Sequence, residues 1–260
     1  MNRISNVFQQ YALQKRTALI PYITPEYPIK NVTVPLILAL ESAGAAMIEV
    51  GIPFSDPLAD GPTIQHSSEI AIRNGATLTR VLELIAEVRT KTQIPLILMG
   101  YVNPVLHYGL DRFCTDAKAA GVDGLIIPDL PPEESEEFRS LCAQNGLSNI
   151  FLIAPTSTDE RIAFIDGCST DFTYCVSVTG VTGARNSFGG NFDGFLSRVK
   201  KHVKKPFVVG FGIKSKEQIA QIAPFANGVV VGSALLQRIA ECTSADEVTV
   251  QAHSFITGLN

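Results

Sequence analysis

Short apolar runs recur along the whole chain and are separated by longer segments with helical spacing. Most of the runs are near-continuous stretches of Val, Ile and Leu without strict polar alternation, which is typical of parallel strands covered on both faces. The strands of an antiparallel sandwich would show a stricter alternation of apolar and polar residues. The runs span residues 18–24, 47–52, 96–101, 124–129, 150–154, 172–178, 207–211 and 229–232. The pattern predicts eight parallel strands.

The segments between these runs have the spacing of amphipathic helices. They span residues 32–42, 78–90, 111–120, 133–145, 159–165, 192–203, 216–222 and the stretch from 235 onward, and an amphipathic segment at 3–15 precedes the first strand. Eight β-α units form either a closed barrel or a doubly wound sheet. A dinucleotide-binding sheet would place GxGxxG after its first strand, where this chain has Pro-Glu-Tyr-Pro at 25–28. We therefore predict an α/β fold, a (β/α)8 TIM barrel with an extra N-terminal helix, as a single domain over residues 1–260.

Composition narrows the class of protein. A hydrophobic share of 46% with 18% charged residues can bury a core, and a net charge of -4 gives no overall attraction for nucleic acid. No apolar stretch reaches the roughly 18 residues of a membrane span, and the first residues lack an apolar signal core. The five cysteines show no metal-binding spacing. We expect a cytoplasmic protein, or a stromal one in a plastid-bearing organism, that binds neither nucleic acid nor membrane.

Small residues build three late turns. They lie at 180–183 after the sixth strand, at 210–212 after the seventh, and at 232–233 where the last helical segment opens. Backbone N–H groups of such turns, and the N-terminus of a helix, can surround phosphate oxygens. A single glycine more often ends a strand or a helix. Three such turns after the last three strands favour the phosphate site that barrels commonly hold there.

Glu49 is a lone acid inside the second apolar run. Burying an unpaired carboxylate costs several kcal/mol or raises its pKa, so Glu49 must be paired or lie near the open mouth of the barrel. Barrel active sites lie at that mouth. The alternative is a structural ion pair. Asp56 and Asp60 follow in a proline-rich loop, and Asp129 ends the fourth strand. Each of these three is a mouth candidate or a cap of a nearby turn or helix.

The chemistry is narrowed further by what the strands lack. None of the eight runs contains a lysine, which disfavours a Schiff-base aldolase. The four histidines are isolated, which disfavours a zinc aldolase. The chemistry that remains is proton transfer by carboxylate side chains to and from a substrate that is held by its phosphate group.

The segment 48–61, I-E-V-G-I-P-F-S-D-P-L-A-D-G, resembles the signature of the tryptophan synthase α subunit family. The similarity continues at 100–104, 124–132, 154–157, 180–184, 210–213 and 232–234. The resemblance implies a carbon-carbon lyase of L-tryptophan biosynthesis that cleaves indole-3-glycerol phosphate to indole and D-glyceraldehyde 3-phosphate. It implies no cofactor and no metal in this subunit. It also implies a β subunit that receives the indole, in an α2β2 heterotetramer.

The resemblance assigns roles by position. Glu49 would be the general acid-base between the glycerol hydroxyl and indole C3. Asp60 would bind the indole N–H and stabilise positive charge, and Tyr174 would lie beside the substrate. The family's phosphate contacts correspond to Gly183, Gly212, Gly232 and Ser233, and its indole pocket to Tyr22, Met99, Ile126, Ile153 and Phe211. Thr182 would lie on a loop that closes toward Asp60. The rim that docks the β subunit would include Asp56, Asn103 and Pro131.

Two departures from the family pattern accompany the match. Residues 24–28 read Thr-Pro-Glu-Tyr-Pro where the family usually has Thr-Ala-Gly-Asp-Pro, and Tyr22 stands where many members carry Phe. Two alternative functions stay open. One is a stand-alone lyase that releases free indole, and the other is a catalytically weak barrel that only activates a partner. Both carboxylates are present, which favours active catalysis.

Overall fold

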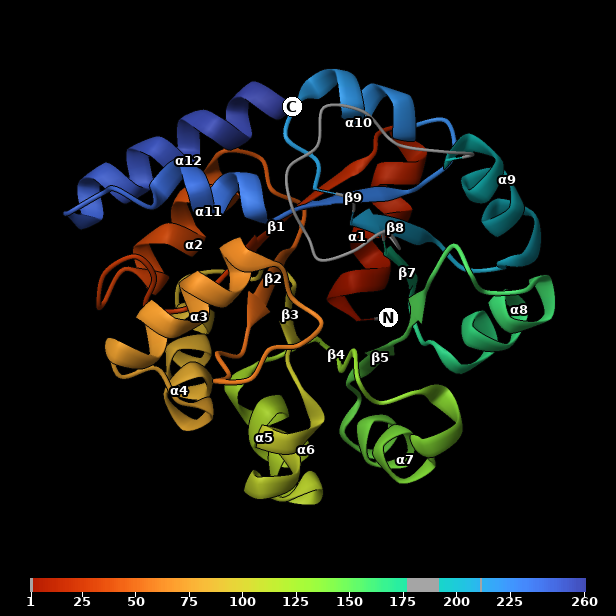
Figure 1. The fold of residues 1–260 in the computed structure, drawn as a ribbon, viewed down its shortest axis with the longest axis horizontal. Helices are drawn as coiled ribbons and strands as arrows, with labels where there is room; N and C mark the ends of the chain where they lie inside the picture. The colour runs from red at the N-terminus through yellow and green to blue at the C-terminus, as the bar shows by residue number, and fades with distance from the viewer. Residues whose placement is uncertain (1, 177–191, 211) are drawn as a thin grey trace.

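The computed structural model describes residues 2–176, 192–210 and 212–260. Its strands form one nearly closed barrel of parallel strands with helices around the outside (Figure 1), in the order β5-β4-β3-β2-β1-β9-β8-β7-β6. The strands are β1 Ala18–Ile23, β2 Ile48–Gly51, β3 Leu96–Met99, β4 Gly124–Ile126, β5 Ser148–Ile150, β6 Leu152–Ile153, β7 Thr173–Val176, β8 Phe207–Gly210 and β9 Gly228–Val231. Only Phe151 separates β5 from β6, so the two are consecutive pieces of the fifth predicted strand. The TIM-barrel prediction is confirmed.

The helices follow the strands in turn. They are α1 Arg3–Leu13, α2 Thr33–Ser42, α3 Pro62–Arg73, α4 Leu78–Arg89, α5 Val102–Tyr108, α6 Leu110–Ala120, the 3-10 turn η1 Pro132–Glu134, α7 Glu136–Asn145, α8 Asp159–Cys168, α9 Phe192–His202, α10 Lys216–Ile222, α11 Ser233–Ile239 and α12 Ala245–Leu259. Two of them, α3 and α5, are not predicted by the sequence pattern. The buried face of α3 includes Ser67 and Ser68, which hide its apolar stripe. In α5, Pro104 lies in the first turn, where the missing N–H costs no helical bond.

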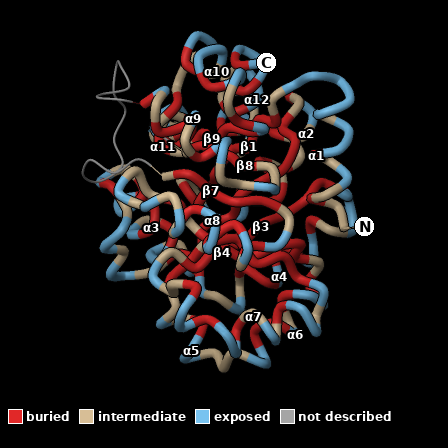
Figure 2. The backbone as a smooth tube through the Cα atoms, turned by 90° about the vertical axis from the view of Figure 1, so that its right-hand side faces the viewer, coloured by how far each residue is buried: buried red, intermediate tan, exposed pale blue. Residues whose placement is uncertain are grey.

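Strand register decides which side chains face the interior of the barrel. Tyr22 is the register partner of Glu49, and Gly51 is the register partner of Met99. Side chains two residues apart on a strand share a face. Glu49 and Gly51 therefore face the same side of β2, toward the interior. Figure 2 shows the buried strands enclosed by helices whose outer faces are exposed.

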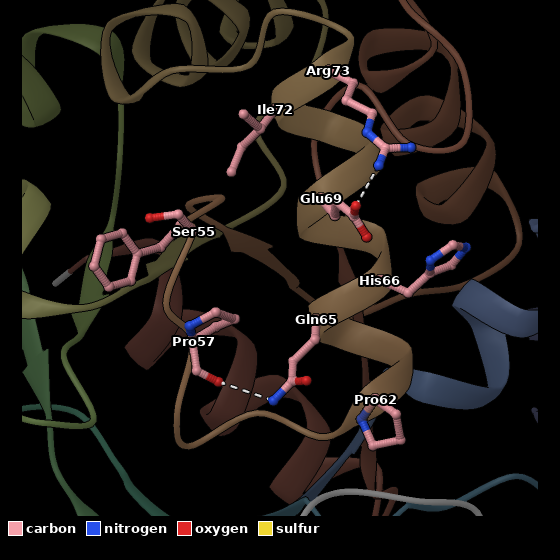
Figure 3. A pocket seen from close by; sticks show the side chains of 9 residues that line it. Ser55, Pro57, Pro62, Gln65, His66, Glu69, Ile72 and Arg73 are labelled. Carbon is pink, nitrogen blue, oxygen red and sulfur yellow. Dashed lines mark hydrogen bonds and ion pairs between the residues drawn. The ribbon is translucent and has the colours of Figure 1, made fainter.

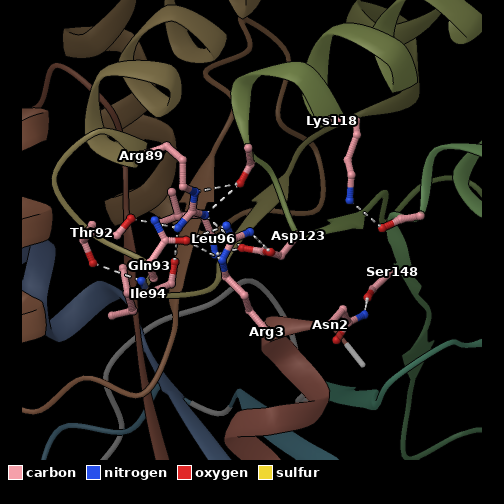
Figure 4. Close-up of polar contacts among 12 residues, drawn as sticks. Asn2, Arg3, Arg89, Thr92, Gln93, Ile94, Leu96, Lys118, Asp123 and Ser148 are labelled. Carbon is pink, nitrogen blue, oxygen red and sulfur yellow. Dashed lines mark hydrogen bonds and ion pairs between the residues drawn. The ribbon is translucent and has the colours of Figure 1, made fainter.

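Helix α1 lies at the N-terminal ends of the strands, opposite the barrel mouth. Arg3 and Arg89 each bind one oxygen of Asp123, the residue just before β4, with N···O distances of 2.9 Å for both pairs (Figure 4). Asn2 Nδ2 donates to Ser148 Oγ at 2.9 Å. These contacts attach the extra N-terminal helix to the barrel bottom. In the described part of the chain, no helix is both long and apolar enough to cross a membrane.

Candidate active site

A cavity of about 240 Å³ opens at the C-terminal ends of the strands. Its lining combines two carboxylates, two tyrosines, an apolar wall and a group of small residues. The lining residues are Tyr22, Glu49, Ala59, Asp60, Ile64, Met99, Pro128, Leu152, Tyr174, Val176, Gly210, Gly212, Val230, Gly232 and Ser233. They come from seven parallel strands and from the loops and helix starts that follow strands, which is where barrel enzymes place their active sites.

Glu49 projects from β2 into this cavity and is only 2% exposed. Other buried acids of the barrel, such as Glu26 and Asp123, bind arginine, whereas Glu49 forms no ion pair within residues 2–176, 192–210 and 212–260. Burial, and then the negative charge of Asp60, raise the pKa of Glu49 to about 8. Among the described residues, Glu49 therefore lacks the partner that a structural ion pair requires. At neutral pH the carboxyl group holds a proton that it can give to a ligand.

Asp60 reaches the same cavity from the loop before α3. Tyr101 Oη donates to Asp60 Oδ2 at 3.0 Å, and Tyr101 Oη itself accepts the Ala59 N–H at 3.0 Å. Burial raises the pKa of Asp60 to about 6, and the hydrogen bond from Tyr101 opposes this rise. Asp60 is thus mostly ionised at neutral pH while Glu49 is mostly protonated. One cavity holds both an acid and an anion, because Glu49 is more deeply buried and is next to the charge of Asp60, whereas Tyr101 stabilises the ionised form of Asp60.

Tyr101 was missed in the sequence analysis, although it lies in the family-like segment 100–104. It is 7% exposed, and its ring packs on Phe54 with centroids 5.5 Å apart. Its hydroxyl joins the end of β3 to the loop that carries Asp60. Only the fold brings these two segments together, since 41 residues separate them in the chain.

Tyr174 projects from β7 and lines the same cavity as Glu49. A Cβ atom at Gly210 would lie 2.3 Å from the Tyr174 hydroxyl, so only glycine leaves room for this tyrosine. Burial and the charge of Glu49 raise the pKa of Tyr174 well above its ordinary value. The phenol remains protonated beside the acid.

The small residues Gly210, Gly212, Gly232 and Ser233 form another part of the cavity lining. Gly212 has a φ of 64°, a conformation that favours glycine. Gly232 caps α11, and Ser233 begins it with a side chain that is 4% exposed. The first N–H groups of a helix have no partner within the helix and suit an anion. Gly183 and Thr182, predicted to act at this site, lie outside the described residues.

The predicted ring pocket is only partly reproduced. Tyr22 and Met99 line the cavity, whereas Ile126 is fully buried and contributes no surface to it; Pro128, two residues on, does. Phe211 lies outside the described residues.

The structure places Leu152, the residue before the predicted Ile153, on the cavity wall. Leu152 is the register partner of the cavity residue Tyr174 and lines the cavity, while Ile153 pairs with Cys175 and is fully buried. Because side chains alternate along a strand, adjacent residues cannot both face the interior. Nothing in a uniformly apolar run marks which of two neighbours faces inward.

The residues predicted for the partner rim surround the same mouth. Asp56 and Asn103 are exposed, and Pro131 is half-buried just before η1. They follow β2, β3 and β4 respectively. Asp129 accepts the Val102 N–H at 2.9 Å, so it caps α5.

A groove of about 660 Å³ lies beside this rim, between the loop after β2 and α3 (Figure 3). Apolar residues line much of it, including Phe54, Pro57 and Ile72. Leu58, on the same loop, is 88% exposed. Exposed apolar surface of this kind is typical of a protein-protein interface.

Comparisons with known proteins agree with this geometry. A family model described as tryptophan synthase alpha chain matches residues 8–258. The tryptophan synthase alpha chain of Geotalea daltonii is 49% identical over 259 residues, covering 100% of this chain and 98% of the relative. The crystal structure of tryptophan synthase subunit alpha from Legionella pneumophila has a TM-score of 0.90 at 36% identity, covering 100% of this chain and 97% of that one.

A structure of the tryptophan synthase a2b2 complex from Pyrococcus furiosus contains a chain with a TM-score of 0.87 at 40% identity, covering 93% of this chain and 97% of that one. Both the sequence and the structural matches span almost the full length, so they extend to the whole barrel and its mouth. This chain belongs to the tryptophan synthase alpha chain family.

Proposed function

We propose that Glu49 is the acid-base group with which this chain carries out the reaction known for its family, the cleavage of indole-3-glycerol phosphate to indole and glyceraldehyde 3-phosphate. The observation that carries the proposal is a carboxyl group 2% exposed, without an ion-pair partner in the described ranges, whose pKa of about 8 leaves it protonated in an open cavity. An efficient acid-base catalyst has its pKa near the working pH.

The proton balance of the reaction needs one such group. Glu49 gives its proton to C3 of the indole ring, which turns the ring into a leaving group. The bond between C3 and the neighbouring glycerol carbon then breaks, and its electron pair restores the aromatic ring. The hydroxyl on that glycerol carbon becomes the aldehyde and returns its proton to the Glu49 carboxylate. The carboxyl group ends protonated, as it began.

Asp60 stabilises the intermediate of this reaction. Protonation at C3 places positive charge on the ring nitrogen, and an ionised carboxylate that accepts the ring N–H lowers the energy of that cation. The Tyr101 hydroxyl, 3.0 Å from Asp60 Oδ2, favours the ionised form that this role requires. Tyr174 keeps water from Glu49.

The substrate lies with its phosphate and its ring at opposite ends of the cavity. Gly212, Gly232 and Ser233 would hold the phosphate, and Gly183 would add to them from outside the described residues. The ring would pack on Met99, Leu152 and Pro128, which form the apolar wall. This placement sets the bond to be cleaved between the two carboxyl groups.

We infer further that a tryptophan synthase β subunit docks on the rim that carries Asp56, Asn103 and Pro131, in an α2β2 assembly. The exposed Leu58 and the neighbouring apolar groove support a protein partner at this mouth. The related Pyrococcus furiosus structure is of an a2b2 complex. A cytoplasmic location fits the five cysteines, all of which are free thiols.

The test is release of glyceraldehyde 3-phosphate from indole-3-glycerol phosphate, measured with and without a β subunit. We expect product in both cases, with a higher rate when the partner is present. Glu49→Gln should abolish turnover while indole-3-glycerol phosphate still binds, as measured by calorimetry. No product from the wild-type chain in either case would refute the function. Full turnover by Glu49→Gln would refute the assignment of the acid, and equal rates with and without the partner would favour the stand-alone lyase.

A further inference from the structure

Tyr22 spans the cavity from its phosphate end toward the carboxyl groups. The base of its ring lies at Gly232, where an added Cβ would be 3.3 Å from Tyr22 Cβ. Its hydroxyl lies over Gly51, where an added Cβ would be only 2.1 Å from the oxygen. Gly51 is the register partner of Met99, which belongs to the apolar wall. The hydroxyl is therefore a polar atom set at the edge of the apolar wall that we assign to the ring.

The environment of this hydroxyl keeps it neutral. Burial comes first, and the charges of Asp60 and then Glu49 add to it, whereas a hydrogen bond with the Thr24 side chain opposes the rise; the pKa of Tyr22 lies well above its ordinary value. Tyr22 is 7% exposed and lines the cavity. A neutral phenol both donates and accepts hydrogen bonds. A ligand that reaches this point meets a hydrogen-bonding group, where a phenylalanine would present only a C–H edge.

We propose that Tyr22 makes the ring end of the cavity selective for indole rings that carry a hydroxyl group, over rings that carry a methyl group at the same position. The two substituents have similar size, so the preference comes from hydrogen bonding. The Thr24 hydrogen bond leaves the phenol able to form a second one. A methyl group against the phenol would shield it from water and offer no second partner, whereas a hydroxyl group on the ring replaces the lost water. The proposal rests on the proposed function, because it concerns the ring of the same substrate.

The experiment measures the reverse reaction, the condensation of an indole with glyceraldehyde 3-phosphate. The probes are unsubstituted indole and matched pairs of hydroxyindole and methylindole, one pair for each benzene-ring carbon that bears hydrogen. For the pair whose substituent meets Tyr22, we expect the wild-type kcat/KM to favour the hydroxyindole by about tenfold or more. Tyr22→Phe should reverse this preference and leave the other pairs unchanged.

Tyr27→Phe is the matched control. It deletes the same atom from a buried tyrosine that is 2% exposed and does not line the cavity, so it should keep the wild-type preference. A Tyr22→Phe variant that keeps the wild-type preference would overturn the proposal. So would a wild-type protein that shows no preference within any pair. A failure of the proposed function would look different from either result, because the wild type would then not condense even unsubstituted indole with glyceraldehyde 3-phosphate.

Discussion

Burial of Glu49, which has no ion-pair partner in the part of the chain that the structure describes, should make this protein less stable as the pH rises. The folded state holds the carboxyl proton up to about pH 8, whereas the unfolded chain releases it near the ordinary value of 4.5. Between these two pH values the folded state binds more protons than the unfolded state, so the free energy of unfolding falls with increasing pH. Replacing Glu49 with Gln keeps the shape of the side chain and removes the titration. The variant should therefore be more stable than the wild type, and by more at higher pH.

The pKa difference sets the size of the effect. Going from 4.5 to about 8, at about 1.36 kcal/mol per pKa unit, gives an upper limit of about 5 kcal/mol at or above pH 8. The side chain is 2% exposed, so solvent screening reduces this limit little, whereas water in the cavity next to it reduces it more. A typical domain is stabilised by roughly 5–15 kcal/mol, so even half of this limit is a large part of the total. A difference of that size in the free energy of unfolding is readily measured.

Urea unfolding from about pH 5 to about pH 9 tests the prediction. The free energy of unfolding of Glu49→Gln minus that of the wild type should grow from about pH 5 to about pH 8 and level off above it. Glu137→Gln, at an exposed position of α7, is the control and should run parallel to the wild type. Parallel curves for Glu49→Gln and the wild type would refute the reasoning, because Glu49 would then titrate alike in the folded and unfolded states.

Three further predictions follow from the site and the barrel bottom. Tyr101→Phe removes the hydrogen bond that holds the pKa of Asp60 down. We expect kcat/KM to fall about tenfold at neutral pH, and the acid limb of its pH profile to move to higher pH. An acid limb that stays in place would contradict this prediction. Gly210→Ala places a Cβ 2.3 Å from the Tyr174 hydroxyl, so kcat/KM should drop at least about tenfold while circular dichroism stays native; wild-type activity would disprove the close approach. Asp123→Asn breaks the ion pairs with Arg3 and Arg89 at the barrel bottom. The free energy of unfolding measured in urea should fall by about 3 kcal/mol, while kcat stays unchanged. A clear fall in kcat would show instead that the barrel bottom is coupled to the active site at the mouth.

The sequence by itself determined the strands, the order of the β-α units and the place of Glu49 within a strand. It did so because parallel strands covered on both faces are continuous apolar runs, in which a single acid stands out. It also indicated the small residues Gly212 and Gly232, which both line the cavity. These features depend on residue type and on local spacing.

Only the tertiary structure decided which side chains meet. Leu152 faces the cavity in place of Ile153 because its register with Tyr174 sets the face, and register depends on the neighbouring strand. The hydrogen bond between Tyr101 and Asp60 joins segments that only the closed barrel brings together. The same is true of the different proton affinities of the two carboxyl groups. Burial and distance set those affinities, and both are properties of the folded chain, since in the sequence Glu49 and Asp60 are simply two acids.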